Sequence, residues 1–374
     1  MSWIYLDHGA STPLDPEVAA ALAAHQQTCF ANPNSVHPLG QASARVLEQA
    51  RTRLARVIHA EPAELTFTSG GTESLCLALL GGADDAGGRV AHSAVEHASV
   101  VEGARWLATH RGMAVDVVPV DREGRVTPAA LAACVGPETR VVAIMMANNE
   151  VGTLNDIPAL AAVVRAQAPQ ARLVVDAVQA LGKVPLDVRT LGADHVAIAA
   201  HKIHGPKGIG ALWSAQPFQP TFKGGGQEGG LRGGTQSVPL AWAFALAAER
   251  HLADMPHVTA LRDRLWLALR DQVPDVAMNG PSFGPERLGN NLHVRVPGLP
   301  SRVLLDALAE RGVYASAGSA CGRGSFSRVL GALGFQTSDG AFIRLTIGRF
   351  TTEAEVDEAA ARFGEVVAIL RRAQ

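Results

Sequence analysis

Apolar and polar residues alternate in blocks between about residue 40 and residue 215, where short apolar runs are separated by Ala- and Leu-rich stretches. The apolar runs predict strands, and the stretches between them, such as residues 157–167, predict helices. Strands that alternate with helices are typical of an α/β fold with a mainly parallel sheet. We expect strands at residues 64–68, 89–92, 114–119, 140–146, 172–175, 195–199 and 210–213.

The last third of the chain has a different pattern. Two long helical stretches (238–253 and 257–272) are followed by two strands (289–296 and 342–347) and by a helix from Thr352. This order predicts a second, smaller α+β domain. We expect a large domain at residues 14–258, and a small domain that combines residues 1–13 with 259–374 and carries Cys321 and Arg344.

Two local signals refine this outline. Asp15, Pro16 and Glu17 predict the start of a helix, because an aspartate caps, proline fits the first turn and an acid suits the positive helix end. Residues 223–235 contain seven glycines. This segment is either a flexible linker or a loop whose backbone approaches a ligand or a second subunit.

Composition and charge exclude several classes of protein. The 374 residues are 47% hydrophobic, with 33 basic and 35 acidic side chains, so neither nucleic acid nor a membrane surface is an expected partner. The longest apolar runs are too short to span a membrane, and the first residues lack the pattern of an export signal. We expect a cytoplasmic protein whose four cysteines are reduced thiols.

The segment AIAAHKIHGPKGIGAL offers the clearest candidate chemistry. Lys202 follows an apolar strand, and α/β folds place ligands at the carboxyl ends of such strands. Burial favours the free amine that Schiff-base chemistry requires. The alternative, a surface lysine beside a turn, fits Lys207 better.

A carboxylate and a glycine turn add to this picture. Asp176 ends another apolar strand, where it can keep the ring nitrogen of pyridoxal phosphate (PLP) protonated, although a helix cap is an alternative role. Gln179 follows three residues later. The sequence Ser69-Gly70-Gly71-Thr72 joins a strand to a helix, and backbone N–H groups at a helix start bind phosphate. A monophosphate such as PLP is therefore the expected ligand.

These residues belong to motifs that together resemble the cysteine desulfurases, which are class V members of the fold type I PLP enzymes. The resemblance runs from about Tyr5 to Glu355. It rests on YLDHGASTP, ANPNSVHPLG, ELTFTSGGTES, VEHASV, ANNEVGTLNDI, VVDAVQALGKVPLD, HKIHGPKGIGAL, GGGQEGGLRGGT, ASAGSAC and FIRLTIGRFTTEAE. It implies a large PLP-binding domain and a homodimer.

The resemblance also implies a role for individual residues. Lys202 would hold the cofactor, and His97 would stack on its ring and act as an acid–base group. The other cofactor contacts would come from Asp176 at the ring nitrogen, Gln179 and Asn149 near the phenolic oxygen, Gly71, Thr72 and His201 at the phosphate, and Thr235 at the phosphate of the neighbouring subunit. Arg344, with Asn34 beside it, would bind the carboxylate of the substrate.

Cys321 would receive the sulfur. It stands among small residues, which favour an exposed loop, and Arg323 can stabilise its thiolate. The implied reaction converts L-cysteine to L-alanine and leaves a persulfide on Cys321. A protein acceptor, such as an iron–sulfur scaffold, would take this sulfur for iron–sulfur clusters, thio-cofactors or tRNA.

The chain departs from the family pattern in several places. Cys321 is followed by Gly-Arg-Gly-Ser, a glycine-containing and basic variant of the usual loop, and the stretch from Cys321 to Arg344 is a few residues shorter than in well-known members, so the departures bear on the preferred sulfur acceptor more than on the core reaction. Ala200 stands where relatives often carry a phosphate-binding serine, and His8 where many carry tyrosine.

Another class V enzyme, such as an aminotransferase or a selenocysteine or cystine lyase, would share Lys202 but would not need Cys321. A PLP-binding protein without catalysis has less support, because Lys202, His97 and Arg344 are all present. A metal hydrolase also has less support, because no carboxylate or further histidine near His201 and His204 completes a ligand set.

Overall fold

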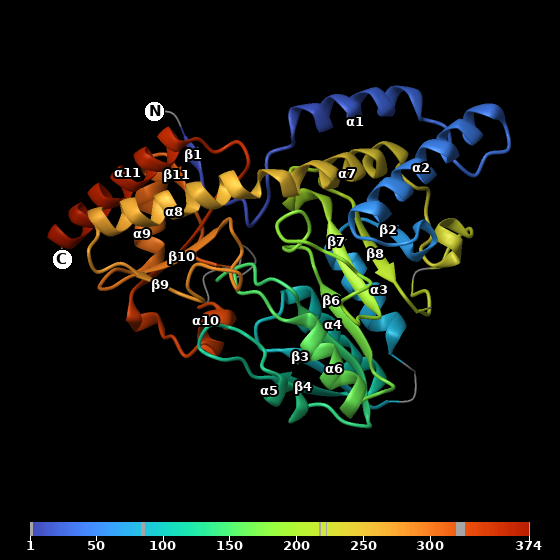
Figure 1. The fold of residues 1–374 in the computed structure, drawn as a ribbon, viewed down its shortest axis with the longest axis horizontal. Coiled ribbons are helices and arrows are strands. Elements are labelled where there is room, and N and C mark those ends of the chain that lie inside the picture. The colour runs from blue at the N-terminus through green and yellow to red at the C-terminus, as the bar shows by residue number, and fades with distance from the viewer. Residues whose placement is uncertain (1–2, 84–86, 217, 222, 319–325, 374) are drawn as a thin grey trace.

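The structure is a computed structural model that describes residues 3–83, 87–216, 218–221, 223–318 and 326–373. Its centre is a seven-stranded sheet (Figure 1). The strand order is β2 (Leu65–Thr68), β8 (Gly210–Ser214), β7 (His195–Ala199), β6 (Arg172–Asp176), β5 (Thr139–Met145), β3 (Arg89–Ser93) and β4 (Ala114–Val118). All neighbours are parallel except β8, which runs antiparallel to β2 and β7. The predicted mainly parallel sheet is confirmed.

Helices cover both faces of this sheet because its strands β8, β7, β6, β5 and β3 bury apolar side chains in both directions, whereas the edge strand β4 is largely exposed. One face packs against α3 (Gly71–Gly82) and α4 (Ala98–Arg111). The other face and its helices form the largest hydrophobic cluster. The helices of that cluster are α1 (Pro16–Thr28), α2 (Pro38–Val57), α5 (Pro128–Ala132), α6 (Ile157–Gln167) and α7 (Val238–His251).

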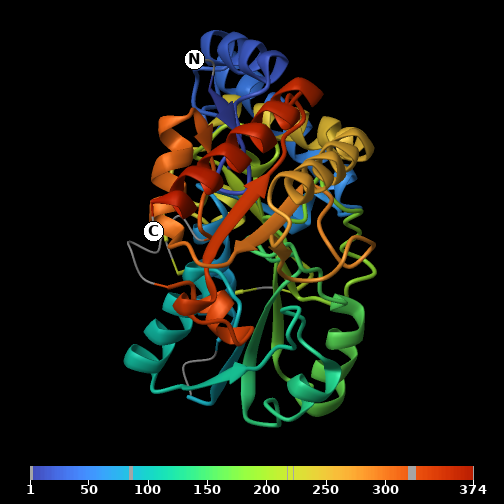
Figure 2. The same ribbon diagram turned by 90° about the vertical axis from the view of Figure 1, so that its left-hand side faces the viewer.

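A second unit has its own hydrophobic core, which includes Ile4 and Leu6 as well as residues from Met255 to Val367. Its elements are β1 (Ile4–Tyr5), α8 (Met255–Gln272), β9 (Ala277–Met278), β10 (Asn291–Val296), α9 (Ser301–Glu310), β11 (Val313–Tyr314), α10 (Arg328–Ala332), β12 (Ala341–Thr346) and α11 (Glu353–Arg372). The order β12-β10-β9 is antiparallel, and β1 pairs with β11 in parallel. In Figure 2 the molecule is turned so that this unit faces the viewer. The exact domain boundary at residue 258 stays a prediction.

One local signal in the sequence acts as expected, and the structure decides between the two readings of another. Asp15 caps α1, since its Oδ1 accepts hydrogen bonds from the backbone N–H groups of Glu17 (2.8 Å) and Val18 (3.4 Å). The glycine-rich segment is tied to the large unit, because Glu228 forms a bidentate ion pair with Arg51 at 2.8 and 2.9 Å. It is therefore not a linker between the two units.

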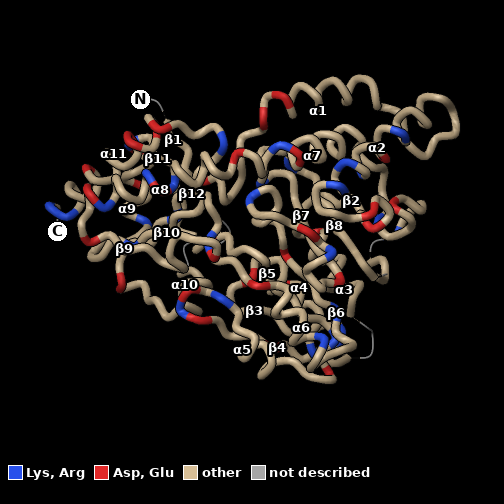
Figure 3. Tube along the Cα trace, viewed as in Figure 1, with Lys and Arg blue, Asp and Glu red and all other residues tan. Residues whose placement is uncertain are grey.

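The surface mixes both signs of charge. Figure 3 shows acidic and basic residues interspersed over both units. Among the described residues, no helix combines the length and the apolar character that a membrane crossing requires.

Candidate active site

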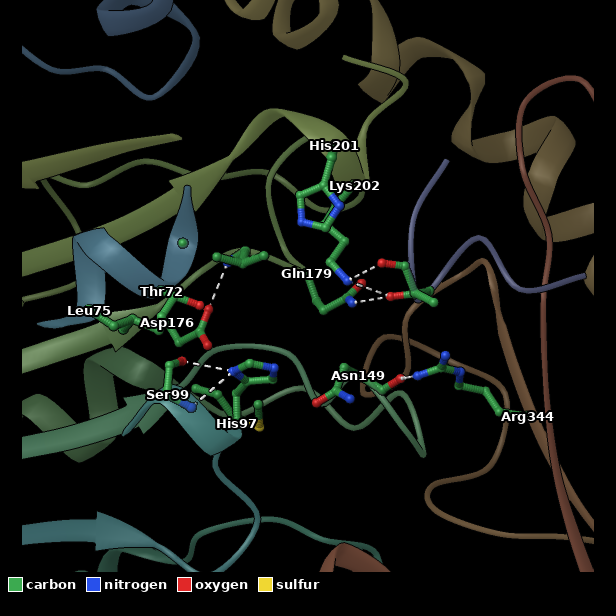
Figure 4. A pocket seen from close by; sticks show the side chains of 15 residues that line it. Thr72, Leu75, His97, Ser99, Asn149, Asp176, Gln179, His201, Lys202 and Arg344 are labelled. Atoms are coloured by element: carbon green, nitrogen blue, oxygen red, sulfur yellow. Dashed lines mark hydrogen bonds between the residues drawn. The ribbon is translucent and has the colours of Figure 1, made fainter. Parts of the chain in front are cut away.

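A cavity of about 250 Å³ opens where the carboxyl ends of the parallel strands meet the second unit. This is the edge of the sheet at which α/β folds bind ligands. Figure 4 shows the side chains that surround it. The lining residues are Gly9, Ala10, Gly71, Thr72, Leu75, His97, Ser99, Met145, Asn149, Asp176, Val178, Gln179, His201, Lys202 and Arg344. Nine of the eleven cofactor- and substrate-binding residues expected from the sequence are in this set, while Asn34 and Thr235 are not.

Lys202 lies in a short 3-10 turn (Ala200–Lys202) directly after β7. Its Nζ donates hydrogen bonds to the backbone carbonyls of Gly9 (2.7 Å) and Ala10 (2.8 Å). These carbonyls belong to the segment that follows β1. The amine is thus held at the cavity by the backbone segment that follows strand β1.

Asp176 and His97 occupy the inner side of the cavity. Oδ1 of Asp176 accepts a hydrogen bond from N–H of Val178 at 2.9 Å, so the residue also acts in part as a local cap. Burial raises the pKa of Asp176, whereas N–H of Val178 and the charges of His97 and Lys202 oppose the rise. The carboxyl group is therefore buried, yet it faces basic partners.

His97 caps α4 and has a defined ring orientation. N–H of Ser99 donates to its Nδ1 at 3.2 Å, and the Ser99 hydroxyl lies 2.7 Å from the same atom. Because a backbone N–H can only donate, Nδ1 is an acceptor, and the proton of the neutral ring lies on Nε2. Burial lowers the pKa of His97, which favours this neutral form.

The N-terminus of α3 forms one end of the cavity. Gly71 and Thr72 begin this helix, so their N–H groups are without intrahelical acceptors and suit an anion. His201 lies nearby, with Nδ1 3.3 Å from the hydroxyl of Ser11. Burial lowers the pKa of His201 to about 4, so the ring is neutral near pH 7.

Arg344 lies on the other side of the cavity from Thr72 and Asp176 in Figure 4. It comes from β12 and is fully buried. Its Nη1 donates to the carbonyl of Asn149 at 2.8 Å, and its Nη2 pairs with Asp7 at 2.6 Å. Among the described residues, its buried Nε has no hydrogen-bond partner. The guanidinium is thus fixed by two contacts and keeps one donor for a ligand.

Two expected residues lie outside the cavity, and a third lies outside the described residues. Asn34 is exposed in the segment between α1 and α2, and Thr235 is exposed before α7; neither lines the cavity. The expected role of Thr235 requires a neighbouring subunit and stays a prediction. Cys321 lies outside the described residues, between Gly318 and Phe326.

The structure also adds residues that the sequence analysis did not single out. Gly9 and Ala10 contribute only backbone carbonyls, and no side-chain pattern reveals such a role. Asp7 and Ser99 are polar residues within the motifs YLDHGASTP and VEHASV. For Ser99 the signal was its place two residues after His97, which was expected at the site. Asp7 belongs to a motif without an expected site residue, so only the motif itself pointed to it.

The residues present fit PLP. The cavity combines a lysine amine, a buried carboxylate, an imidazole, a helix N-terminus and an arginine with an unused donor. PLP requires these groups for its aldehyde, ring nitrogen, ring face and phosphate, and an amino-acid substrate requires the arginine for its carboxylate. Gly71 permits close packing, since an added Cβ would lie 2.6 Å from Cγ2 of Val178.

Comparisons with known proteins agree with this chemistry. The family described as Aminotransferase class-V matches residues 4–359. "Cysteine desulfurase 2" of Trichormus variabilis is 37% identical, over 99% of this chain and 94% of its own. "Cysteine desulfurase IscS" of Methanosarcina thermophila is 36% identical, over 98% and 93%.

Two solved structures are similar to this chain over more than nine-tenths of its length. A NifS-like protein has a TM-score of 0.90 and 32% identity, over 98% of this chain and 100% of its own. A structure described as SspA in complex with cysteine has a TM-score of 0.82 and 27% identity, over 93% and 100%.

Proposed function

Because this chain belongs to the class-V aminotransferase family and, within it, to the cysteine desulfurases, we propose that it transfers sulfur from L-cysteine to Cys321 and releases L-alanine. The observation that carries the proposal is the cavity itself. It brings Lys202, Asp176, His97 and Arg344 together from four separate elements and from both units.

The cofactor proposed for this cavity is PLP, held by the residues that line it. Lys202 would bind its aldehyde, and Asp176 its ring nitrogen. The remaining contacts come from His97 at the ring face, Gln179 and Asn149 at the phenolic oxygen, and Gly71, Thr72 and His201 at the phosphate. When bound, PLP supplies an electron sink that makes the Cα proton of an amino acid acidic.

The residues of the chain would then act on the substrate. Arg344 binds and orients the carboxylate of cysteine through Nε and the guanidinium fork. Lys202 removes the proton at Cα. His97 has its Nε2 proton free of contact with Ser99, so it can exchange a proton with the substrate.

The sulfur step is proposed for Cys321. Its thiolate attacks Sγ of the substrate, so that a sulfur–sulfur bond forms and the Cβ–Sγ bond breaks. The electron pair of the broken bond goes to Cβ, which is protonated and becomes the methyl group of alanine. The substrate carbon is reduced and the cysteine sulfur is oxidised to a persulfide, so no external oxidant is required.

The assembly and the acceptor extend this proposal. Thr235 is exposed and outside the cavity of its own chain, which suits a contact with the phosphate in a second subunit of a homodimer. A protein acceptor would collect the persulfide sulfur, for iron–sulfur clusters or for thio-cofactor and tRNA synthesis. A cytoplasmic location also stays a prediction.

Replacing Cys321 tests the sulfur step. Purified protein is loaded with PLP and given L-cysteine, and alanine and protein-bound persulfide are measured. Cys321→Ser should keep the visible absorbance of the bound cofactor but lose persulfide and at least 90% of alanine formation, since an alcohol is a far weaker nucleophile than a thiolate. Cys29→Ser, a matched control, should retain both.

The outcomes separate the alternatives. Alanine formation that is indifferent to Cys321→Ser would point to a general class V lyase. A protein that acquires no visible band with PLP would contradict the cofactor assignment.

A further inference from the structure

Lys183 is a buried amine that the proposed reaction does not use. It follows β6 in a turn, and its side chain is almost fully removed from solvent, at 5% exposure. Its Nζ donates a hydrogen bond to Oε1 of Gln179 at 2.8 Å. Among the described residues, Lys183 forms no ion pair with a carboxylate. A buried amine without a counter-ion is costly, and such groups concentrate at functional sites.

Basic groups surround Lys183 on several elements. His8 follows β1, Lys202 and His204 follow β7, His251 ends α7 and Arg344 lies on β12. The ring centroids of His8 and His204 are 5.7 Å apart, and those of His204 and His251 are 5.3 Å apart. Burial, together with the charges of Lys202 and Arg344, lowers the pKa of Lys183 well below its usual value.

Neighbouring charges complete these surroundings. His201 also faces Lys183, and Arg349 and Asp15 act on His204. Burial lowers the pKa of His8 to about 3 and that of His204 to about 4, so both rings are neutral near pH 7. Loss of the Lys183 proton leaves two N–H donors on the amine. The bond to Gln179 therefore does not depend on the protonation state of Lys183.

The contacts of Gln179 fix the orientation of its amide. Its Nε2 donates to the carbonyl of Gly9 at 2.8 Å, and the same carbonyl accepts a hydrogen bond from Nζ of Lys202 at 2.7 Å. A carbonyl oxygen only accepts, so Nε2 must face Gly9 and Oε1 must face Lys183. The amide lines the cavity, and Figure 4 shows it beside Lys202. The second N–H of Nε2 is the donor that the amide has left for a ligand.

We propose that Lys183 is a positioning residue that holds Oε1 of Gln179 and thereby restricts this amide to donating a hydrogen bond toward the phenolic oxygen of the cofactor. The inference rests on the proposed function, because it assigns that oxygen to the cavity side of Gln179. Without Lys183, Oε1 loses its donor and only the carbonyl of Gly9 orients the amide, so the amide can turn away from that carbonyl and offer Oε1, an acceptor, to the same oxygen. Lys183 thus favours the deprotonated state of the phenolic oxygen without contacting the cofactor.

The test is a pH titration of the visible absorbance of the PLP-loaded protein. A donor at the phenolic oxygen lowers the pH midpoint of the absorbance change, because it stabilises the deprotonated oxygen. Lys183→Met keeps the length and the apolar stem of the side chain but removes the donor. The midpoint should rise by about one pH unit, the shift expected for one hydrogen bond to a charged group.

Two further variants separate positioning from charge. Lys207→Met removes a positive charge from an exposed position in the loop after Lys202, and it should leave the midpoint within a few tenths of a unit. In a Gln179→Ala background, Lys183→Met should have little further effect, because the residue through which Lys183 acts is gone. An equal shift in both backgrounds would show that Lys183 acts as a charge and would overturn the proposal.

The remaining outcomes are distinct from a failure of the proposed function. A wild-type protein without a visible band would contradict the cofactor assignment and this inference together. A band whose midpoint is unchanged by Lys183→Met would overturn the inference alone. A changed melting temperature with an unchanged midpoint would show that Lys183 is structural only.

Discussion

Glu96 shows how strongly the fold controls a single ionisable group. Its Oε1 accepts hydrogen bonds from the hydroxyl of Ser93 (2.5 Å) and from N–H of Met145 (2.8 Å), while its buried Oε2 has no partner among the described residues. Burial raises the pKa of Glu96 to about 8. The side chain therefore keeps a proton at neutral pH, directly before His97 in the sequence.

This pKa predicts how stability changes with pH. Between about pH 4.5 and pH 8 the folded protein binds more protons at Glu96 than the unfolded chain does, so this residue makes the protein less stable as the pH rises. Glu96→Gln should keep both accepted hydrogen bonds and remove the effect. The difference in free energy of unfolding between pH 6 and pH 8.5 should shrink by about 2 kcal/mol, measured by urea unfolding of the apoprotein.

Glu102→Gln provides the matched control for this measurement. Glu102 is exposed, and within the described part of the chain its ion pair is with Arg105 on the surface of α4, so its substitution should leave the pH dependence unchanged. If Glu96→Gln and the wild type show the same pH dependence, Glu96 is ionised in the folded protein and the prediction is wrong.

The start of α3 depends on a glycine for packing rather than for backbone freedom. A Cβ on Gly71 would lie 2.6 Å from Cγ2 of Val178, closer than real side chains approach. Val178 in turn donates its N–H to Asp176. The start of the helix, the carboxylate and the proposed phosphate site are therefore in direct contact.

Gly71→Ala should weaken PLP binding because the added methyl group displaces Val178 or the first turn of α3. Overpacking of this kind costs about 1–3 kcal/mol, so the dissociation constant of PLP should rise about tenfold. Titration of the apoprotein with PLP, followed by absorbance, measures it. Adding Val178→Ala should recover part of the affinity, and Gly331→Ala, in α10 where a Cβ meets nothing within 4 Å, should have no effect. Unchanged affinity in Gly71→Ala would refute this account.

Most regular elements could be predicted from the sequence, because their signals are local. Strand β7 and helix α6 match the expected residues 195–199 and 157–167, and the other predicted strands end within one or two residues of their expected bounds. Strands β1 and β11 have two residues each, which is too few for a recognisable pattern. Their pairing joins segments about 300 residues apart, so no local signal indicates it. The reversed direction of β8 is likewise set by tertiary contacts.

The sequence could predict those site residues whose side chains take part in the expected chemistry. Lys202, Asp176 and Gly71 stand at strand ends or at a helix start, where local chemistry indicates a ligand. The carbonyls of Gly9 and Ala10 carry no side-chain signal, and the pairing of Arg344 with Asp7 joins residues 337 positions apart. Such contacts follow only from the folded arrangement of the two units.

The two hydrophobic cores meet around an ion-pair cluster as well as around the cavity. Arg349, which follows β12, pairs through Nη1 with Oδ2 of Asp15 at 2.7 Å and through Nε with Asp254 at 3.1 Å. Arg250 from α7 lies 3.7 Å from the same oxygen of Asp15. The Asp15 side chain is almost fully buried. These contacts therefore join the start of α1, where Asp15 lies, and helix α7 to the second unit.

Asp15→Asn isolates this electrostatic link, because asparagine caps helices as well as aspartate does and the start of α1 should survive. Loss of the charge leaves Arg349 and Arg250 without their shared partner, and the free energy of unfolding should fall by about 1–3 kcal/mol in urea. Glu17→Gln removes an exposed partner of Arg250 and should cost less than about 1 kcal/mol. If both variants lose the same free energy of unfolding, the buried ion pairs of Asp15 stabilise the protein no more than an exposed pair does. Apolar packing would then join the two units instead.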